Sequence, residues 1–365
     1  MALMKSLKIV GISILTIVLL FLAFFSWAWL SAYTPEGTEK IEVNCSPEAK
    51  SMPAGHRLKV LNWNIQYMAS KDYVFFYDVP DGSGPDARPS DEAVTRTIKD
   101  VARVIKEENP DVIVLQEIHD KAVRTSHRDQ LAELKQELGK DYGCDASAFY
   151  WKAKFVLHPK IMGSVGMKLS TLSKYKINSA TRFQLPLMDN DPITRHFYFY
   201  RAILETRMAV AEKDEISIMN THLDAFSQGT DTMQRQIARV DELLSERQKQ
   251  GIPFLITGDF NLLPPGKGRG RLPEHIQPRF NEKPEIKVLY DKYAAIPSLA
   301  QANGPEAAKW YTHLPNDPAI TKPDRTIDYM FYDKKLKLLA HRVRQGDTWK
   351  ISDHLPLIAT FELSR

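Results

Sequence analysis

The stretch PFLITGDFNLLPPG, from Pro253 to Gly266, begins as an apolar run typical of a strand inside a sheet and turns polar at Asp259 and Asn261. In an extended chain, residues two apart point to the same side, so these two side chains would share one face while Phe260 turns into the packing. Asp and Asn are also common in ordinary turns. Whether this pair belongs to a site therefore depends on how the other strands end.

The composition is that of a large folded protein. The chain has 365 residues, 43% of them hydrophobic, which is enough to bury one large α/β core or two smaller ones. The formal net charge is only +4, with both signs spread along the chain. This balance does not indicate a nucleic-acid-binding surface and merely permits an anionic substrate.

The N-terminus predicts a membrane anchor. Ile9 to Leu30 carries no charged residue, and at about 1.5 Å per residue it reaches roughly 33 Å, enough to cross a bilayer core. Trp27 and Trp29 lie where a cleavable signal would need small residues, so an uncleaved helix over 9–30 is favoured over a signal peptide that is removed to give a secreted protein. Two lysines within residues 1–8 predict a cytoplasmic N-terminus and an extracytoplasmic remainder.

Residues 31–57 lack either hydrophobic period and are rich in Pro, Glu, Ser and Lys, which predicts a linker. From residue 58 to 365 there is no repeat and no second linker, which predicts one domain. Cys45 and Cys144 form no zinc-binding or redox spacing. In an oxidising compartment they could form a disulfide, but two free buried thiols are an equal alternative.

Short β-branched runs alternate with helical patterns over the domain. A strand, an amphipathic helix and a strand are expected over 57–65, 90–110 and 111–118, and the same order recurs over 215–224, 231–251 and 253–261. Further strands are expected over 164–170, 197–208, 326–333 and 356–363. This number of elements suits two sheets with helices outside.

Polar side chains recur at the ends of these strands. They are Asn64, Glu117, His222, Asp259, Asn261, Asp328, Asp353 and His354. Each alone is typical of a turn or of a structural histidine. Together in one crevice they would concentrate negative charge that a divalent cation must neutralise, and oxygen-rich ligands without cysteine favour Mg²⁺ or Mn²⁺. Such a site suits hydrolysis at phosphorus.

The motifs NWNI, LQE, NTHLD, GDFN, TIDYMF and SDHLP, in that order, resemble those of the endonuclease/exonuclease/phosphatase superfamily, whose fold is deoxyribonuclease I-like. The resemblance extends from Leu58 to Leu363. It implies an α/β (α+β) fold, a four-layer sandwich of two mixed β-sheets packed face to face and flanked by helices, here with an N-terminal transmembrane helix.

The resemblance also implies roles for individual residues. Glu117 would be the principal Mg²⁺ ligand, with Asn64 nearby and Asp353 contributing. Asp259 would orient or deprotonate the attacking water. Asn261 and Asn64 would hold the scissile phosphate.

Two histidines complete the implied site. His354 would act as a general base or as a charged donor to the phosphate, with Asp328 as its orienting carboxylate. His222 resembles the family histidine that contacts the phosphate or protonates the leaving oxygen. The acidic partner of that histidine would lie within residues 149–157, which contain no carboxylate, so a general-acid role for His222 is in question.

The superfamily leaves the substrate open. An extracytoplasmic enzyme anchored beside lipid head groups suits a sphingomyelinase-like phosphodiesterase, which we expect in preference to an extracytoplasmic nuclease or to a non-catalytic binding member. Basic residues after the catalytic strand, Lys267, Arg269, Arg271 and Arg279, could form an anion-recognising rim or a solvated loop. Aromatic residues between 73 and 77 could meet a bilayer or cap the core. Nothing in the sequence implies a protein partner.

Overall fold

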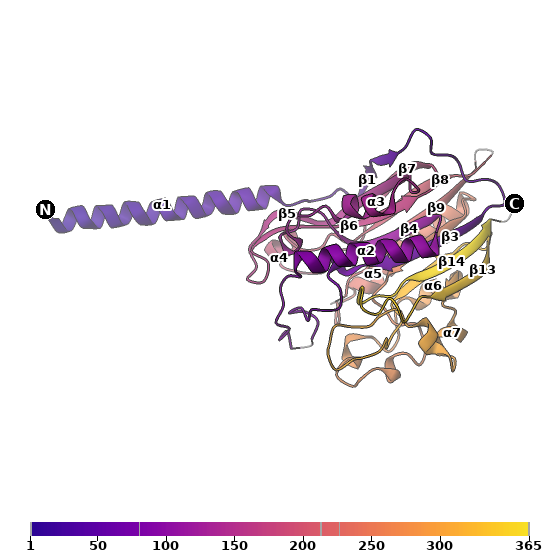
Figure 1. Ribbon diagram of the computed structural model, residues 1–365. Helices are drawn as coiled ribbons and strands as arrows, with labels where there is room; N and C mark the ends of the chain where they lie inside the picture. Colours follow the sequence, from indigo (N-terminus) through magenta and orange to yellow (C-terminus); the bar gives the residue numbers. More distant parts are fainter. Residues whose placement is uncertain (1, 80, 212–213, 226, 364–365) are drawn as a thin grey trace.

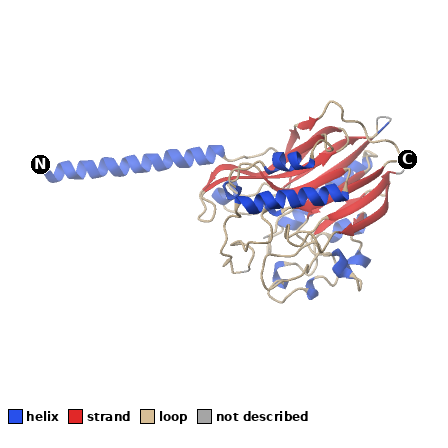
Figure 2. Cartoon of the chain, in the orientation of Figure 1, coloured by secondary structure: helices blue, strands red, loops and turns tan. Residues whose placement is uncertain are grey.

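The computed structural model describes residues 2–79, 81–211, 214–225 and 227–363, whose strands form two mixed seven-stranded sheets (Figures 1 and 2). The first sheet has the order β1 (Thr38–Ile41), β7 (Ile177–Gln184), β8 (Ala202–Ala209), β9 (Glu215–His222), β10 (Phe254–Asp259), β12 (Asp328–Tyr332) and β11 (Ala294–Ile296). The second has the order β13 (Leu336–Val343), β14 (Leu357–Leu363), β3 (Arg57–Asn64), β4 (Val112–His119), β6 (Gly163–Ser173), β5 (Cys144–Val156) and β2 (Val43–Cys45).

The described helices are α1 (Ala2–Ser31), α2 (Asp91–Glu108), α3 (Gln130–Leu138), α4 (Pro192–His196), α5 (Thr232–Lys249), α6 (Lys287–Lys292) and α7 (Leu299–Asn303). Short 3₁₀ turns occupy Gln66–Met68, Val123–Thr125, Arg269–Arg271, Gln277–Arg279 and Ala307–Trp310. The long helix predicted over 90–110 is confirmed as α2. Its first turn is capped by the Ser90 hydroxyl, which accepts from the Ala93 N–H, and it ends at Asn109 in the left-handed conformation.

Four layers follow from where the apolar side chains go. The two sheets face one another across a core that includes Val60 and Val114 from one sheet and Ile218 and Leu255 from the other. Helices α2 and α3 cover the outer face of the second sheet, where Val94, Ile98 and Leu134 pack on residues such as Ile113. Helices α5 and α6 cover the first sheet through a separate cluster around Ile237, Leu289 and Phe254. The predicted four-layer sandwich is confirmed.

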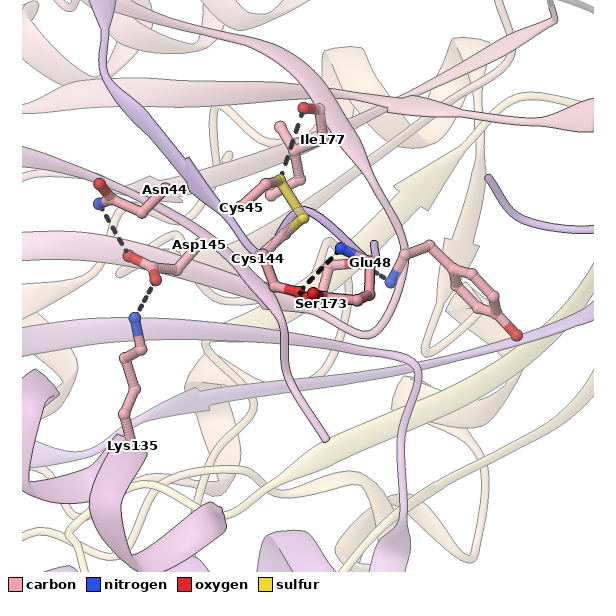
Figure 3. Close-up of a disulfide and its surroundings, with 10 residues drawn as sticks. Asn44, Cys45, Glu48, Lys135, Cys144, Asp145, Ser173 and Ile177 are labelled. Atoms are coloured by element: carbon pink, nitrogen blue, oxygen red, sulfur yellow. Dashed lines mark hydrogen bonds and ion pairs between the residues drawn. A yellow bond between two sulfur atoms is a disulfide. The ribbon is translucent and has the colours of Figure 1, made fainter. Parts of the chain in front are cut away.

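The segment 31–57, expected to be a linker, is corrected by the structure. It contributes edge strand β1 to the first sheet and edge strand β2 to the second, paired with β7 and β5 respectively. Cys45 and Cys144 are bonded to one another, which settles the pairing left open by the sequence (Figure 3). Beside the disulfide, Asp145 accepts from Asn44 and pairs with Lys135 (Figure 3). The segment therefore belongs to the two-sheet sandwich.

Helix α1 projects away from the sandwich, and only its C-terminal end reaches the body (Figure 1). Residues Met4–Ser31 are long and apolar enough to cross a membrane, with a mean hydropathy of 2.7 over the most apolar window. The end of the helix lies beside β5 and α4, which are also the elements at one end of the sandwich (Figure 1).

Candidate active site

The ends of three neighbouring strands place acidic and imidazole groups in one row. Strand β10 runs parallel to β9 and antiparallel to β12, and Asp259 is in register with His222 on one side and with Asp328 on the other. The same row requires Gly258, because a Cβ there would lie 1.9 Å from the Thr221 carbonyl oxygen. The glycine of GDFN is therefore what allows β10 to approach β9 closely enough to set this register.

The second sheet supplies the facing groups. Asn64 ends β3 in register with Gln116 of β4, so Glu117 lies at the same end. The Asn64 amide donates to Glu117 Oε1 at 3.0 Å and to Asp259 Oδ2 at 3.1 Å, and its oxygen accepts from the Gln66 N–H. Asn64 is fully buried, so it links the carboxylates of Glu117 and Asp259 from the protein interior.

The loop that leads into β14, the neighbour of β3, is tied to the same place. The Ser352 hydroxyl donates to the Asn64 carbonyl, and the Trp63 indole donates to the His354 carbonyl at 2.9 Å. These bonds hold Asp353 and His354 at the end of β3 although they are about 290 positions later in the chain.

His354 lies between two carboxylates. Its Nδ1 is 2.8 Å from Asp328 Oδ2, and its Nε2 is 3.5 Å from Asp259 Oδ2. Burial alone would lower the pKa of His354, but the charges of Asp328 and Asp259 outweigh burial and raise it to about 10. The imidazole is therefore charged at neutral pH and donates from both ring nitrogens.

Two carboxyl groups in the cleft hold protons more tightly than usual. Burial raises the pKa of Asp259 to about 7 against the opposing charge of His354. Burial and the neighbouring Asp353 carboxylate raise the pKa of Glu117. Glu117 also has a φ of 61°, in the left-handed region that a glutamate rarely adopts, and such backbone strain concentrates at functional sites.

His222 is neutral and has a phenol as partner. Its Nδ1 lies 3.3 Å from Tyr150 Oη and its Nε2 lies 3.4 Å from Asp259 Oδ2. Burial lowers the pKa of His222 well below its usual value, and Arg201 and His354 lower it further. Tyr150 belongs to the segment 149–157, which contains no carboxylate to pair with His222. That segment therefore supplies His222 with a hydroxyl group as partner instead.

Several expected site residues line one cleft of about 550 Å³. They are Glu117, His222, Asp259, Asn261, Asp353 and His354. Asn64 and Asp328 stand behind this surface, each at most 1% exposed. The structure thus brings all eight together, six at the surface of the cleft and two supporting them.

Sequence reasoning missed three groups at the cleft. Arg201, at the start of β8, is 4% exposed and pairs with Asp224 at 3.2 Å, while its Nη1 has no hydrogen-bond partner among the described residues. His313 lies with its ring 4.8 Å from that of His354, and Tyr150 contacts His222. The one signal available in the sequence was an arginine inside the strand expected over 197–208, since a charge that is buried needs a partner.

The basic loop after β10 mostly serves structure. The Arg269 guanidinium donates to the carbonyls of Gln277 and Phe280, and the Arg271 guanidinium donates to those of Ala302 and Asn303. Arg279 is the member of the expected rim that lines the cleft. In the aromatic segment Phe75 is fully buried in the core, whereas Phe76 and Tyr77 line the cleft.

The described residues offer two groups of metal-binding atoms. His313, Asp353 and His354 place ligand atoms within 4.8 Å of one another, as do Asp259, Asp328 and His354. Glu117 belongs to neither group, but it lies close enough to Asp353 for the charge of one carboxylate to act on the other. In the described part of the chain, no lysine or arginine forms an ion pair with Glu117 or Asp353. Two carboxylates that lack a cationic partner fit a divalent cation between them.

The fold is shared with solved structures of low sequence identity. An endonuclease/exonuclease/phosphatase from Beutenbergia cavernae DSM 12333 matches with a TM-score of 0.58 and 21% identity, covering 84% of this chain and 72% of that one. The human Nocturnin catalytic domain with bound sulfate anion matches with a TM-score of 0.50 and 17% identity, and the match covers 89% of this chain and 98% of that one. An endonuclease/exonuclease/phosphatase from Bacteroides vulgatus matches with a TM-score of 0.51 and 16% identity, and the match covers 85% of this chain and 100% of that one.

No curated protein sequence is significantly similar to this chain. A family model does match, over residues 61–354, which include all eight residues of the cleft and its support. The match therefore covers most of the chain and both sheets. This chain belongs to the Endonuclease/Exonuclease/phosphatase family, and it is a metal-dependent hydrolase of phosphoester bonds.

Proposed function

We propose that the chain is a Mg²⁺-dependent phosphodiesterase, anchored in a membrane by α1 and acting on lipid head groups on the extracytoplasmic side. The observation that carries this proposal is the extent of the cleft. One end holds Asp259 and His354, and the other end is lined by Phe25 of α1 itself. A substrate with a phosphoester at one end and an apolar body at the other matches a cleft built in this way.

The wall between these two ends is apolar and aromatic. Side chains that line it include Trp151, Val156, Leu157, Phe197 and Phe199. A strand of nucleic acid would need cations along its backbone at this position, since phosphate contacts dominate its binding. Four arginines line the same cleft, namely Arg124, Arg201, Arg279 and Arg325, but the five side chains of this wall offer hydrocarbon surface, which favours a lipid.

The polar end supplies the groups for hydrolysis. Asp259, with a pKa raised to about 7, is placed to orient the attacking water and take its proton. His354, charged and held by Asp328, donates to a phosphoryl oxygen, which makes a charged donor the better assignment than a general base. Asn261 lines the cleft two positions from Asp259 and is assigned to the phosphate.

Neutral His222 has the geometry of a phosphate donor. Because Tyr150 can donate to its Nδ1, the remaining N–H is on Nε2, next to Asp259. Arg201 adds Nη1, a guanidinium nitrogen without a hydrogen-bond partner in the described part of the chain. The two groups suit recognition of phosphoryl oxygens, and the low pKa of His222 disfavours the general-acid role.

Glu117 and Asp353 are the proposed metal ligands, and Asn64 holds Glu117 in place through its amide. Oxygen ligands in an acidic pocket favour Mg²⁺, with Mn²⁺ as a substitute. When bound, the ion offsets charge on the phosphoryl oxygens and lowers the pKa of water. The Asn64 oxygen already accepts from Gln66, so its part in the site is to position Glu117 and Asp259.

The disulfide supports the compartment. Cys45 and Cys144 are bonded, and disulfides persist in oxidising surroundings outside the cytoplasm. Lys5 and Lys8 precede the apolar stretch, an arrangement that keeps the N-terminus cytoplasmic. Both features favour a catalytic domain on the extracytoplasmic face.

The test uses the full chain, purified in detergent, with Mg²⁺ and a panel of substrates: sphingomyelin, phosphoinositides, single-stranded and duplex DNA, and bis-p-nitrophenyl phosphate. We expect hydrolysis of a lipid phosphodiester and of the generic diester, with loss of both on chelation. Cleavage of nucleic acid alone would overturn the lipid assignment and support the extracytoplasmic nuclease. Absence of turnover on every substrate would support a binding role.

A further inference from the structure

The end of α1 is fastened to the catalytic domain. The Trp29 ring stacks on His196 of α4 at 3.7 Å, and the Trp29 carbonyl lies 2.8 Å from His196 Nε2. Phe24 meets Phe155 of β5 edge to face at 5.0 Å, and Ala28 is buried. These contacts fix the direction in which the domain extends from the helix, so the same face of the domain always points along α1.

That face carries exposed apolar side chains. Leu157 and Met162, in the loop between β5 and β6, are 56% and 49% exposed, and Ile193 of α4 is 57% exposed. Outside α1, the other large apolar side chains exposed in the described part of the chain are less so, at 38–41%. Leu157 and Met162 follow β5 and Ile193 belongs to α4, the two elements that contact the end of α1, which distinguishes the three from apolar residues scattered singly over a surface.

Basic residues flank the apolar ones. Lys154 and Lys160 are exposed on the same loop and strand end, and neither forms an ion pair with a described residue. An apolar patch edged by lysines is the composition of a surface that rests in the head-group region of a bilayer, where the lysines meet lipid phosphates.

The depth of α1 places this face at the membrane. Trp27 and Trp29 mark the interface, as tryptophans do at the ends of spanning helices. Phe25, about 9 Å further along the helix from its end, lines the same cleft as Leu157 and Ile193. The mouth of the cleft therefore opens at the level where the helix enters the bilayer.

We propose that Leu157, Met162 and Ile193, with Lys154 and Lys160, form a membrane-seating surface that rests on the bilayer crossed by α1. Seated in this way, the cleft opens toward the lipid, so that a head group reaches Asp259 without the lipid leaving the membrane. The inference rests on the proposed anchoring by α1 but not on the lipid being the substrate.

The test places probes on this surface in the full chain, reconstituted in phosphatidylcholine nanodiscs with and without phosphatidylglycerol. Leu157→Cys and Ile193→Cys, each labelled with an environment-sensitive fluorophore, are compared with Val288→Cys and Leu339→Cys. The controls are exposed apolar positions on α6 and β13, and the native cysteines are bonded to each other and do not take the label. We expect a blue shift and quenching by doxyl-labelled lipid at 157 and 193 alone.

Equal spectra at all four positions would overturn the proposal. A blue shift at 157 and 193 without doxyl quenching would also overturn it, because a second copy of the chain would then be covering the surface. These spectra do not depend on activity, so docking with cleavage of nucleic acid alone would leave the inference standing while the lipid function fails. Lipid cleavage without blue shift and quenching at 157 and 193 would overturn the seating surface and leave the lipid function standing.

A second measurement tests the consequence for turnover. Met162 does not line the cleft, so Met162→Glu should leave hydrolysis of bis-p-nitrophenyl phosphate unchanged. In nanodiscs it should lower lipid hydrolysis several-fold, because a carboxylate opposes contact with the bilayer. Leu339→Glu is the matched control and should change neither rate. An undiminished lipid rate in Met162→Glu would contradict the seating.

Discussion

Asp259 has two carboxylate oxygens in different surroundings. Oδ1 accepts from the Asn261 N–H at 2.9 Å, which fixes the plane of the group, and Oδ2 faces Asn64, His222 and His354. One oxygen is thus held by the backbone while the other is directed at the groups that meet the substrate. This division suits a base that must keep its orientation while it exchanges a proton.

Asp259→Asn should therefore lower kcat on bis-p-nitrophenyl phosphate by about 10²–10⁴, the usual contribution of a positioned acid or base. The amide keeps the size of the side chain, so the unfolding midpoint should change little. Asp291→Asn, on the exposed face of α6, is the matched control. A kcat within a factor of ten of the unmodified enzyme would remove Asp259 from the proton transfer.

The carboxyl groups also predict how metal activation varies with pH. Both Glu117 and Asp259 have raised pKa values, so they gain protons as the pH falls, and a protonated carboxyl binds a cation poorly. The Mg²⁺ concentration for half-maximal activity should rise as the pH is lowered, because Glu117, a proposed ligand, then takes up a proton. His354, with a pKa of about 10, stays charged throughout this range. Metal titrations at pH 6, 7 and 8 measure the effect, and a constant requirement would contradict it.

Residues whose role is visible in a motif were the ones that sequence could predict. Asp259 follows an apolar run and His354 precedes one, and their roles could be inferred from the ordered set of motifs to which both belong. Arg201, Tyr150 and His313 could not be found in this way, because each acquires its role from a contact with a residue far away in the chain. Tyr150 in particular lies in a strand whose polar and apolar residues give no sign of a site.

At the level of elements, strands with a buried apolar run were predicted and those without one were missed. Strand β10 is buried at all six positions, whereas in β13 the lysine, histidine and arginine interrupt the apolar residues and four of the eight positions are exposed. Edge strands β1 and β2 are only four and three residues long, and their conformation comes from pairing with β7 and β5 rather than from their own residues. A linker was therefore the natural interpretation of 31–57.

The disulfide is what keeps edge strand β2 in place. It joins residues separated by 99 positions, and a cross-link over a loop of this length restricts the unfolded chain strongly. Replacing both cysteines, Cys45→Ser with Cys144→Ser, should lower the free energy of unfolding by about 2–4 kcal/mol. Denaturant unfolding of the variant, and of the unmodified protein with and without a reductant, measures this. Equal stability in all samples would show that the disulfide does not stabilise the fold.

For the whole molecule, the important relation is between the anchor and the cleft. The contacts of Trp29 and Phe24 hold the domain at a fixed angle to α1, and the cleft runs from Phe25 to the row of strand ends at Asp259. The polar groups at the strand ends and a helix able to cross a membrane therefore line the same cleft. A signal peptide removed after export would leave that end of the cleft open, so retention of α1 is the property on which this arrangement depends.

Retention and orientation can be measured together in a bacterial host that expresses the full chain. The protein should remain in membranes washed with alkaline carbonate, and its purified form should retain the α1 sequence by mass spectrometry. Protease added outside spheroplasts should digest the catalytic domain. Exchanging the two basic residues, Lys5→Glu with Lys8→Glu, should increase the fraction of chains that resist the protease, because the positive charges before the apolar stretch of α1 set its orientation. A mature protein that begins near Ser31 would instead establish a signal peptide, and the domain would then reach lipid only from solution.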